Sequence, residues 1–134
     1  MIVLDASAAI EFVLGTPTGR RVRDRVAASG VSIHAPHLID PEVAQVMRRK
    51  AALREISADR AKEALDDFAD LRLSRYPHGP LLERAWELRE RLTAYDAMYV
   101  VLAEALAAPL VTTDRRLARV RGLGARVELL SDRG

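Results

Sequence analysis

Short apolar runs alternate along this chain with longer segments of helical periodicity, and this alternation restricts the possible folds more than any other feature. The apolar runs are too short for helices and are typical of buried strands. They are MIVLD at 1–5, VSIHAP at 31–36, LRLSRY at 71–76, LVTT at 110–113 and ARVELL at 125–130. No two-residue hairpin signal joins them, so a parallel sheet covered on both faces is favoured. We expect a three-layer α/β/α sandwich with a central, mostly parallel sheet.

Segments with helical patterns lie between these runs. They are SAAIEFVL at 7–14, residues 18–28, HLIDPEVAQVMRRKAAL at 37–53, ISADRAKEALDDFADL at 56–71, PLLERAWELRERL at 80–92, AYDAMYVVLAEALAA at 94–108 and DRRLARV at 114–120. Asp40, as a cap before Pro41, marks the start of the helix at 37–53, and Ser57 is the expected cap of the next one. The segment at 94–108 is apolar on nearly every side, which indicates a helix packed on two faces.

Some side chains can be assigned to the core or the surface from these patterns. In the segment at 80–92, the residues that suit an inward stripe are Leu82, Ala85, Trp86 and Leu92. Phe68 and Trp86 are expected in the core. The histidines do not have the spacing of a zinc site, and we expect ordinary surface or loop positions for His34, His37 and His78.

Length and composition limit the class of protein. The 134 residues match one domain, which we place at 1–134. Cysteine is absent, so any metal would be held by oxygen or imidazole ligands. The first residues, MIVLDASAAIEFVL, lack a basic leader and meet an acid at position 5, which predicts neither a signal peptide nor a membrane span. We therefore expect a soluble, cytoplasmic protein.

Acidic residues lie at places that converge in a parallel sheet. Asp5 directly follows the first apolar run, and Asp114 directly follows LVTT. Both are expected at the carboxyl ends of strands, where ligands bind in such sheets. Glu42 and Asp96 lie in the first turns of the helices at 37–53 and 94–108, so those helix starts could bring them to the same edge.

Helix capping is a competing interpretation of each acid. Asp5 and Asp114 could cap the helices that follow them, and Glu42 could favourably meet a helix dipole. Asp96 fits a capping box with Thr93 as the cap. Capping alone, however, exchanges Ser, Thr, Asn and Asp freely, whereas all four positions here are carboxylates.

Grouped carboxylates suit hard cations such as Mg²⁺ and Mn²⁺, which take oxygen ligands. Two such ions about 3.5–4 Å apart can activate a water and stabilise the departing oxygen of a phosphodiester. The pattern therefore points to a metal-dependent nuclease. Ser7 and Thr112 could orient ligands or water, although either could equally bond to local backbone.

Basic residues are compatible with a polyanion partner. The net charge is only +2, but arginine clusters at RRVRDR, RRK and, beside Asp114, at Arg115 and Arg116. We expect Arg115 and Arg116 to hold the phosphate backbone, which gives affinity independent of sequence. The alternative is that these clusters only solvate helix faces.

The sequence resembles the PIN-domain ribonucleases, and especially the VapC toxins of bacterial toxin–antitoxin pairs. The resemblance covers nearly the whole chain, through MIVLDASAAI, APHLIDPEVAQVMRR and TAYDAMYVVLAEALAAPLVTTDRRLARV. It implies an acidic catalytic and metal site with supporting hydroxyls, made of Asp5, Glu42, Asp96, Asp114, Ser7 and Thr112. It also implies Mg²⁺ or Mn²⁺, an RNA substrate, a homodimer, and a VapB-type antitoxin in a larger complex. Gln45 stands where many relatives carry asparagine.

Other classes fit less well. A phosphatase with an aspartyl nucleophile needs a second acid where this chain has Ser7, and a receiver domain needs a late lysine, whereas the two lysines are Lys50 and Lys62. A catalytically weak or inactive module of the same fold, which binds RNA or protein, remains open. The expected function is an endoribonuclease toxin that cleaves single-stranded or loop RNA by two-metal-type hydrolysis.

Overall fold

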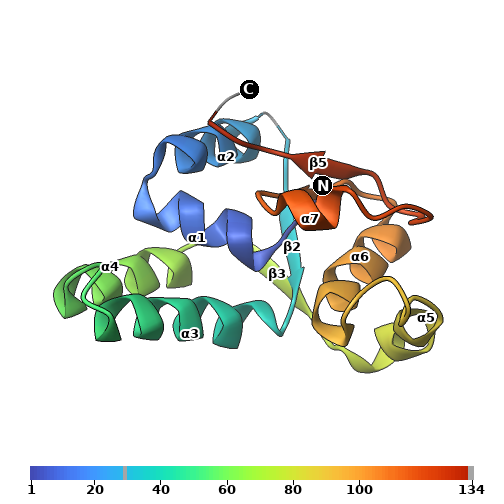
Figure 1. The fold of residues 1–134 in the computed structure, drawn as a ribbon. Helices are drawn as coiled ribbons and strands as arrows, with labels where there is room; N and C mark the ends of the chain where they lie inside the picture. Colours follow the sequence, from blue (N-terminus) through green and yellow to red (C-terminus); the bar gives the residue numbers. More distant parts are fainter. Residues whose placement is uncertain (29, 133–134) are drawn as a thin grey trace.

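A five-stranded parallel sheet forms the centre of the computed structural model, which describes residues 1–28 and 30–132 (Figure 1). Its strands are β1 (Ile2–Leu4), β2 (Ile33–Pro36), β3 (Leu73–Tyr76), β4 (Leu110–Thr112) and β5 (Val127–Leu129). The spatial order is β3-β2-β1-β4-β5, and every neighbouring pair is parallel. Each strand lies within one of the apolar runs, so the expected parallel sheet is confirmed.

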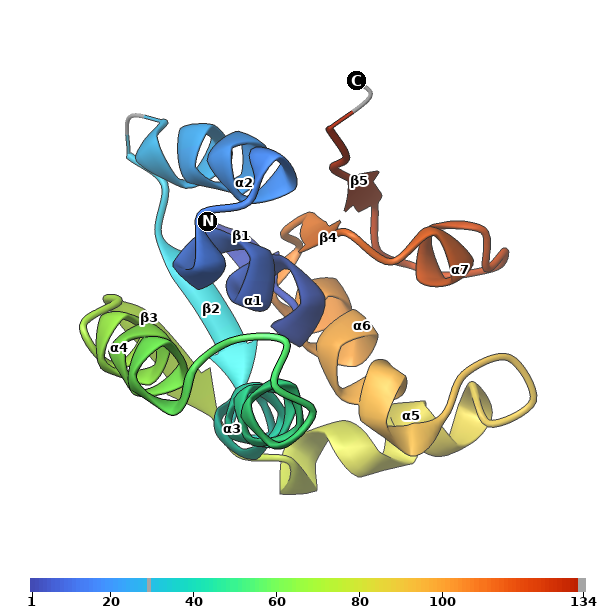
Figure 2. The same ribbon diagram turned by 60° about the vertical axis from the view of Figure 1, so that its left-hand side comes forward.

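Helices cover both faces of the sheet. They are α1 (Ala6–Leu14), α2 (Pro17–Ala27), α3 (Ile39–Ala52), α4 (Ala58–Ala69), the 3₁₀ turn η1 (Gly79–Leu81), α5 (Leu82–Glu87), α6 (Ala94–Leu106) and α7 (Arg115–Ala118). Helices α1 to α4 pack against one another on one side, and α5 and α6 lie on the other (Figures 1 and 2). The three-layer α/β/α sandwich is confirmed.

The order of the strands creates a switch point between β1 and β4. From β1 the chain proceeds to β2 and β3 on one side, then returns to place β4 and β5 on the other side of β1. In open parallel sheets, ligands bind in the crevice outside the carboxyl ends of the strands at which the order reverses. The fold therefore directs attention to the residues that follow β1 and β4.

The core is built on the central strands and on α6. Ile2, Val3, Leu4, Leu110 and Val111 are almost completely buried. Seven consecutive residues of α6, from 97 to 103, are buried as well, because this helix packs on β1, β2 and β4 and also on α5. The expected helix packed on two faces is confirmed.

The inward stripe of the segment at 80–92 was predicted in the wrong register. Ala85 and Leu92 are buried as expected, but Leu82 is 57% exposed and Trp86 is 67% exposed. The buried stripe is formed by Leu81, Ala85, Leu88 and Leu92. Leu82 and Trp86 form a second apolar row one residue further along, and helical spacing alone does not distinguish two adjacent rows. Phe68 is buried, as expected.

Asp40 does not cap α3, contrary to the prediction. The helix starts earlier, at Ile39, and its cap residue Leu38 donates its backbone N–H to Nε2 of His78 at 2.9 Å. Asp40 instead forms an ion pair with Arg75 of β3, with Nε–Oδ2 at 2.8 Å. A partner from a distant strand thus determines the role of Asp40. By contrast, Ser57 caps α4 as expected, accepting from the N–H of Arg60.

One histidine was also misassigned. His37 is exposed, but His34 lies in β2 with only 7% of its surface exposed. Its two ring nitrogens lie within hydrogen-bonding distance of the Ser32 and Tyr76 hydroxyls, at 2.7 and 2.6 Å. Burial of this imidazole is possible because both nitrogens have partners.

None of the helices in the described ranges has the length and apolar character needed to cross a membrane.

Candidate active site

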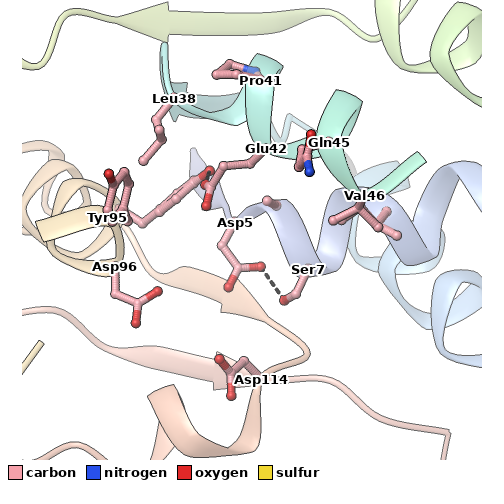
Figure 3. A pocket seen from close by; sticks show the side chains of 13 residues that line it. Asp5, Ser7, Leu38, Pro41, Glu42, Gln45, Val46, Tyr95, Asp96 and Asp114 are labelled. Atoms are coloured by element: carbon pink, nitrogen blue, oxygen red, sulfur yellow. Dashed lines mark hydrogen bonds between the residues drawn. The ribbon is translucent and has the colours of Figure 1, made fainter. Parts of the chain in front are cut away.

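The carboxylates singled out in the sequence line one cavity of about 510 Å³ (Figure 3). Asp5 follows β1, and Asp114 follows β4, so both lie at the switch point of the sheet. Glu42 comes from the first turn of α3 and Asp96 from the first turn of α6. The expectation that these acids share one edge is therefore met, although they are up to 109 positions apart in the chain.

Asp5 is the most buried of the acids, with 6% of its surface exposed. Its Oδ1 accepts hydrogen bonds from the Ser7 hydroxyl at 2.6 Å and from the Ala8 N–H at 3.0 Å. Its Oδ2 accepts from the Thr112 hydroxyl at 2.5 Å. Burial, with a small addition from the negative charge of Asp114, raises the pKa of Asp5 to about 6 against the lowering effect of these hydrogen bonds. The site thus holds a carboxylate whose charge is poorly compensated by the protein itself.

Ser7 and Thr112 join the ends of β1 and β4 around this carboxylate. Besides donating to Asp5, Ser7 Oγ accepts from the N–H of Thr113 at 3.1 Å, and Thr112 Oγ1 accepts from the N–H of Asp114 at 3.0 Å. Each hydroxyl has one proton, which is directed to Asp5. Both residues therefore bond to the acid and to local backbone at once, so the two interpretations of the sequence are compatible.

Glu42 has a partner that the sequence did not indicate. The hydroxyl of Tyr99, on α6, donates to Oε1 of Glu42 at 2.5 Å. Burial raises the pKa of Glu42, the bond from Tyr99 lowers it, and the negative charge of Asp96 raises it. Tyr99 is 3% exposed and sits within an apolar helix, where a tyrosine is normally assigned to the core.

Capping and cavity lining coincide at two of the acids. Asp5 caps α1, and Asp114 caps α7 through Oδ1, which accepts from the N–H of Arg116 at 2.9 Å. Asp96 is not itself a cap, because the Thr93 hydroxyl accepts the Asp96 N–H at 3.1 Å and caps α6. The carboxyl group of Asp96 remains in the cavity.

The two arginines next to Asp114 differ in their surroundings. Arg116 lies with one guanidinium nitrogen 3.5 Å from both Asp96 Oδ2 and Asp114 Oδ2, while 75% of its side chain is exposed. The side chain of Arg115 is exposed and has no ion-pair or hydrogen-bond partner among the described residues. Arg116 therefore neutralises part of the acidic cluster, and Arg115 is available for an external anion.

The donor set fits a hard divalent cation. The carboxylate oxygens face one cavity, and burial, with a smaller effect of neighbouring negative charge, raises the pKa of Asp5 and Glu42, so a cation between them would stabilise their ionised forms. Within residues 1–28 and 30–132, no three carboxyl or imidazole groups are already grouped tightly enough to hold one ion. Mg²⁺ commonly keeps several waters and binds through one or two carboxylates, which suits this more open arrangement.

The fold and the site define a class of α/β protein with an acidic pocket at the switch point of a parallel sheet. The chain belongs to the PIN domain family, whose sequence profile matches residues 2–123. Ribonuclease VapC1 of Mycobacterium tuberculosis is 42% identical to it over 129 residues, which is 96% of each chain.

Two solved structures have similar folds. The crystal structure of PAE2754 from Pyrobaculum aerophilum has a TM-score of 0.70 at 26% identity, over 94% of this chain and 87% of that one. VapBC2 from Rickettsia felis, crystallised with a DNA fragment from its promoter, contains a chain with a TM-score of 0.70 at 16% identity. That alignment covers 98% of this chain and 100% of the other.

Proposed function

We propose that this chain is an endoribonuclease and the toxin of a type II toxin–antitoxin pair. The observation that carries the proposal is the meeting of Asp5, Glu42, Asp96 and Asp114 in one cavity at the sheet's switch point. Membership of the PIN domain family and 42% identity to a protein named Ribonuclease VapC1 support the same activity. The nuclease domain spans residues 1–134, and its reaction is hydrolysis of a phosphodiester in single-stranded or loop RNA.

The proposed cofactor is Mg²⁺ or Mn²⁺, held by the four carboxylates. When bound, the metal supplies Lewis-acid stabilisation of the phosphodiester and activates the attacking water, as in two-metal nucleases. The residues of the chain prepare this site. Ser7 and Thr112 fix both oxygens of Asp5, and Tyr99 fixes one oxygen of Glu42, so these ligands do not need to be ordered when the cation arrives.

Arg115 and Arg116 have different parts in the proposed reaction. Arg115 is exposed beside the cavity and contacts the RNA backbone as a fixed positive charge. Arg116 lies against Asp96 and Asp114 and turns from these acids to the phosphate when metal and RNA enter. Both roles rest on charge and do not depend on base sequence.

The proposed partners follow from the similarity of this chain to VapC proteins. A relative is named Ribonuclease VapC1, and a fold neighbour comes from a crystal structure of VapBC2. We therefore propose a VapB-type antitoxin that blocks the acidic cavity, and a homodimer as the unit that it binds within a larger complex. The site of action is the cytoplasm, where the RNA substrate is found.

The test is incubation of purified protein with a panel of structured RNAs in Mg²⁺, in Mn²⁺ and in chelator. We expect cleavage with metal and no cleavage in chelator. In Asp5→Asn the rate of cleavage should fall at least 1,000-fold, of the order seen when one essential group is removed. Metal-dependent cleavage that persists in Asp5→Asn would contradict the assignment of the site. Metal-dependent RNA binding without cleavage would favour the alternative, an inactive module of the same fold.

A further inference from the structure

The cavity offers more than an acidic cluster. Its remaining walls are mainly apolar or aromatic and include Ile10, Leu38, Pro41, Val46, Tyr95 and Tyr99. Carboxylates with a cation account for the phosphate of a substrate, but they give no reason for an apolar wall beside it. A nucleotide has both kinds of surface, a charged phosphate and a flat base with an apolar face.

Tyr95 is the most distinctive part of this wall. It lines the cavity, yet 64% of its surface is exposed to solvent. Its neighbour in the chain is Asp96, and it lies one helical turn before Tyr99, which bonds to Glu42. Residues four apart lie on the same face of a helix, so Tyr95 and Tyr99 both line the cavity from α6.

The backbone under Tyr95 is firmly held. It lies in the first turn of α6, whose cap is Thr93, and the following residues are buried from 97 onward. An aromatic ring on a rigid helical turn loses little conformational entropy when a ligand stacks on it, because the side chain has only two rotatable angles. The ring is therefore preorganised for contact with a flat group.

The side chains on the two sides of the acids differ, so the two nucleotides that adjoin the cleaved bond would meet different residues. In Figure 3, Leu38 and Tyr95 lie together on one side of Glu42, and Gln45 and Val46 lie on the other. The acids lie between and below these groups, where the phosphate would be held. The base on one side of the cleaved bond would thus reach Tyr95, and the base on the opposite side would not.

We propose that Tyr95, backed by Leu38, is a stacking platform for the unpaired base of one nucleotide adjoining the cleaved phosphodiester. This inference rests on the proposed function and names the substrate class more closely. The platform needs a base that is unstacked from its neighbours, so the target is a nucleotide splayed out of a loop or single strand. Stacking on an aromatic ring tolerates any of the four bases, so Tyr95 selects for an unpaired base and not for its identity.

The test combines variants of the protein with variants of the RNA. The substrate is an RNA from the panel whose cleavage site has been mapped, together with two versions that carry an abasic nucleotide immediately 5′ or 3′ of that site. Tyr95→Ala should lower kcat/KM on the intact RNA by about 10- to 100-fold, and Tyr95→Phe by about twofold or less. On one of the two abasic RNAs, Tyr95→Ala should leave kcat/KM almost unchanged, because there is no base to stack.

Trp86→Ala is the matched control. Trp86 is another exposed aromatic residue, at 67%, but it does not line the cavity. Removal of its ring should change kcat/KM by the same factor on the intact and the abasic RNAs. If Tyr95→Ala also changes kcat/KM by the same factor on all three RNAs, or leaves it unchanged on all of them, the platform is refuted. Loss of antitoxin binding alone in Tyr95→Ala would likewise refute it and assign the residue to a protein interface.

A second readout does not depend on cleavage. The same RNA carrying 2-aminopurine at the adjoining nucleotide is titrated with protein in chelator, where stacking quenches the fluorescence. Quenching that is present in Tyr95→Phe and lost in Tyr95→Ala supports the platform. If no RNA is cleaved with any metal, the nuclease proposal fails, and 2-aminopurine placed at the loop nucleotides of a panel RNA still decides whether Tyr95 stacks an unpaired base.

Discussion

At the scale of single residues, one side chain can serve both folding and the candidate site. Asp5 and Asp114 each cap a helix with one carboxylate oxygen, while the other oxygen accepts a hydrogen bond from a side chain, the Thr112 hydroxyl for Asp5 and the Arg116 guanidinium for Asp114. A carboxylate has several acceptor sites, so capping uses only part of its capacity. Capping and metal binding, which compete as explanations of the sequence, are thus compatible in the structure.

Tyr99 provides a prediction about Glu42. Tyr99→Phe removes the hydrogen bond that lowers the pKa of Glu42, so the carboxyl group should keep its proton to higher pH. We expect Mn²⁺ affinity at pH 6 to fall about tenfold, with a smaller loss at pH 8. Titration calorimetry across this pH range measures the effect, and Tyr95→Phe is the control because it makes no bond to an acid. An equal loss at both pH values would argue for a structural role.

Arg115 provides a prediction about RNA affinity. Its side chain is exposed and it follows Asp114, which lines the cavity, so Arg115→Ala should weaken RNA binding and reduce the slope of log K against log salt by about one. The measurement is fluorescence anisotropy in chelator at several salt concentrations. Lys62→Ala is the control, since Lys62 is an exposed cation of α4, outside the cavity, that pairs with Asp66. A slope unchanged by Arg115→Ala would remove this residue from the RNA path.

At the scale of elements, the close packing of α2 against α1 helps to hold Asp5, the cap of α1, in position. Asp5 caps helix α1, which carries Ser7, and α2 follows after the turn at Gly15, whose φ of 65° suits glycine. The two helices meet most closely at Gly19, where an added Cβ would lie 1.9 Å from the carbonyl oxygen of Glu11. The position of α1 therefore depends on the absence of a side chain in α2.

Gly19→Ala should destabilise the protein. The added methyl group meets backbone, which cannot move aside as a flexible side chain can, so we expect a loss of about 1–3 kcal/mol in the free energy of unfolding. Urea denaturation in chelator measures it. Gly79→Ala is the matched control because nothing lies within 4 Å of its added Cβ. Equal stability of the two variants would show that α1 and α2 can separate at no cost.

At the scale of the whole molecule, the fold holds negative charges together that would separate in the unfolded chain. The pKa of Asp5 is about 6 in the folded protein, against 3.8 as the ordinary value, mainly because of burial. Between these values the folded state binds more protons than the unfolded state. In metal-free protein, Asp5 should therefore stabilise the folded state increasingly as pH falls through 6, because burial of the ionised group is relieved.

Between pH 7 and pH 5, Asp5 should add about 1.4 kcal/mol to the free energy of unfolding, measured by urea denaturation in chelator as the difference between the unaltered protein and Asp5→Asn. Glu104 and Glu128 are paired with arginines, which lower their pKa values, so their stabilisation is lost only below this range. In Asp5→Asn this gain should disappear, which leaves the half-buried Glu42, whose raised pKa favours the folded state at lower pH, and the buried His34, whose lowered pKa has the opposite effect. A pH dependence of stability that is the same in Asp5→Asn as in the unaltered protein would contradict this account.

The sequence by itself determined the strands, the parallel sheet and the edge at which the acids meet. These features follow from local properties: a strand is a short apolar run, and a residue that ends a parallel strand lies at the carboxyl edge whatever else surrounds it. Only the tertiary structure decided which of two apolar rows in the segment at 80–92 faces inward, that Asp40 pairs with Arg75, and that Tyr99 bonds to Glu42. Those outcomes depend on partners brought from distant elements by packing, and no local pattern encodes the identity of such a partner.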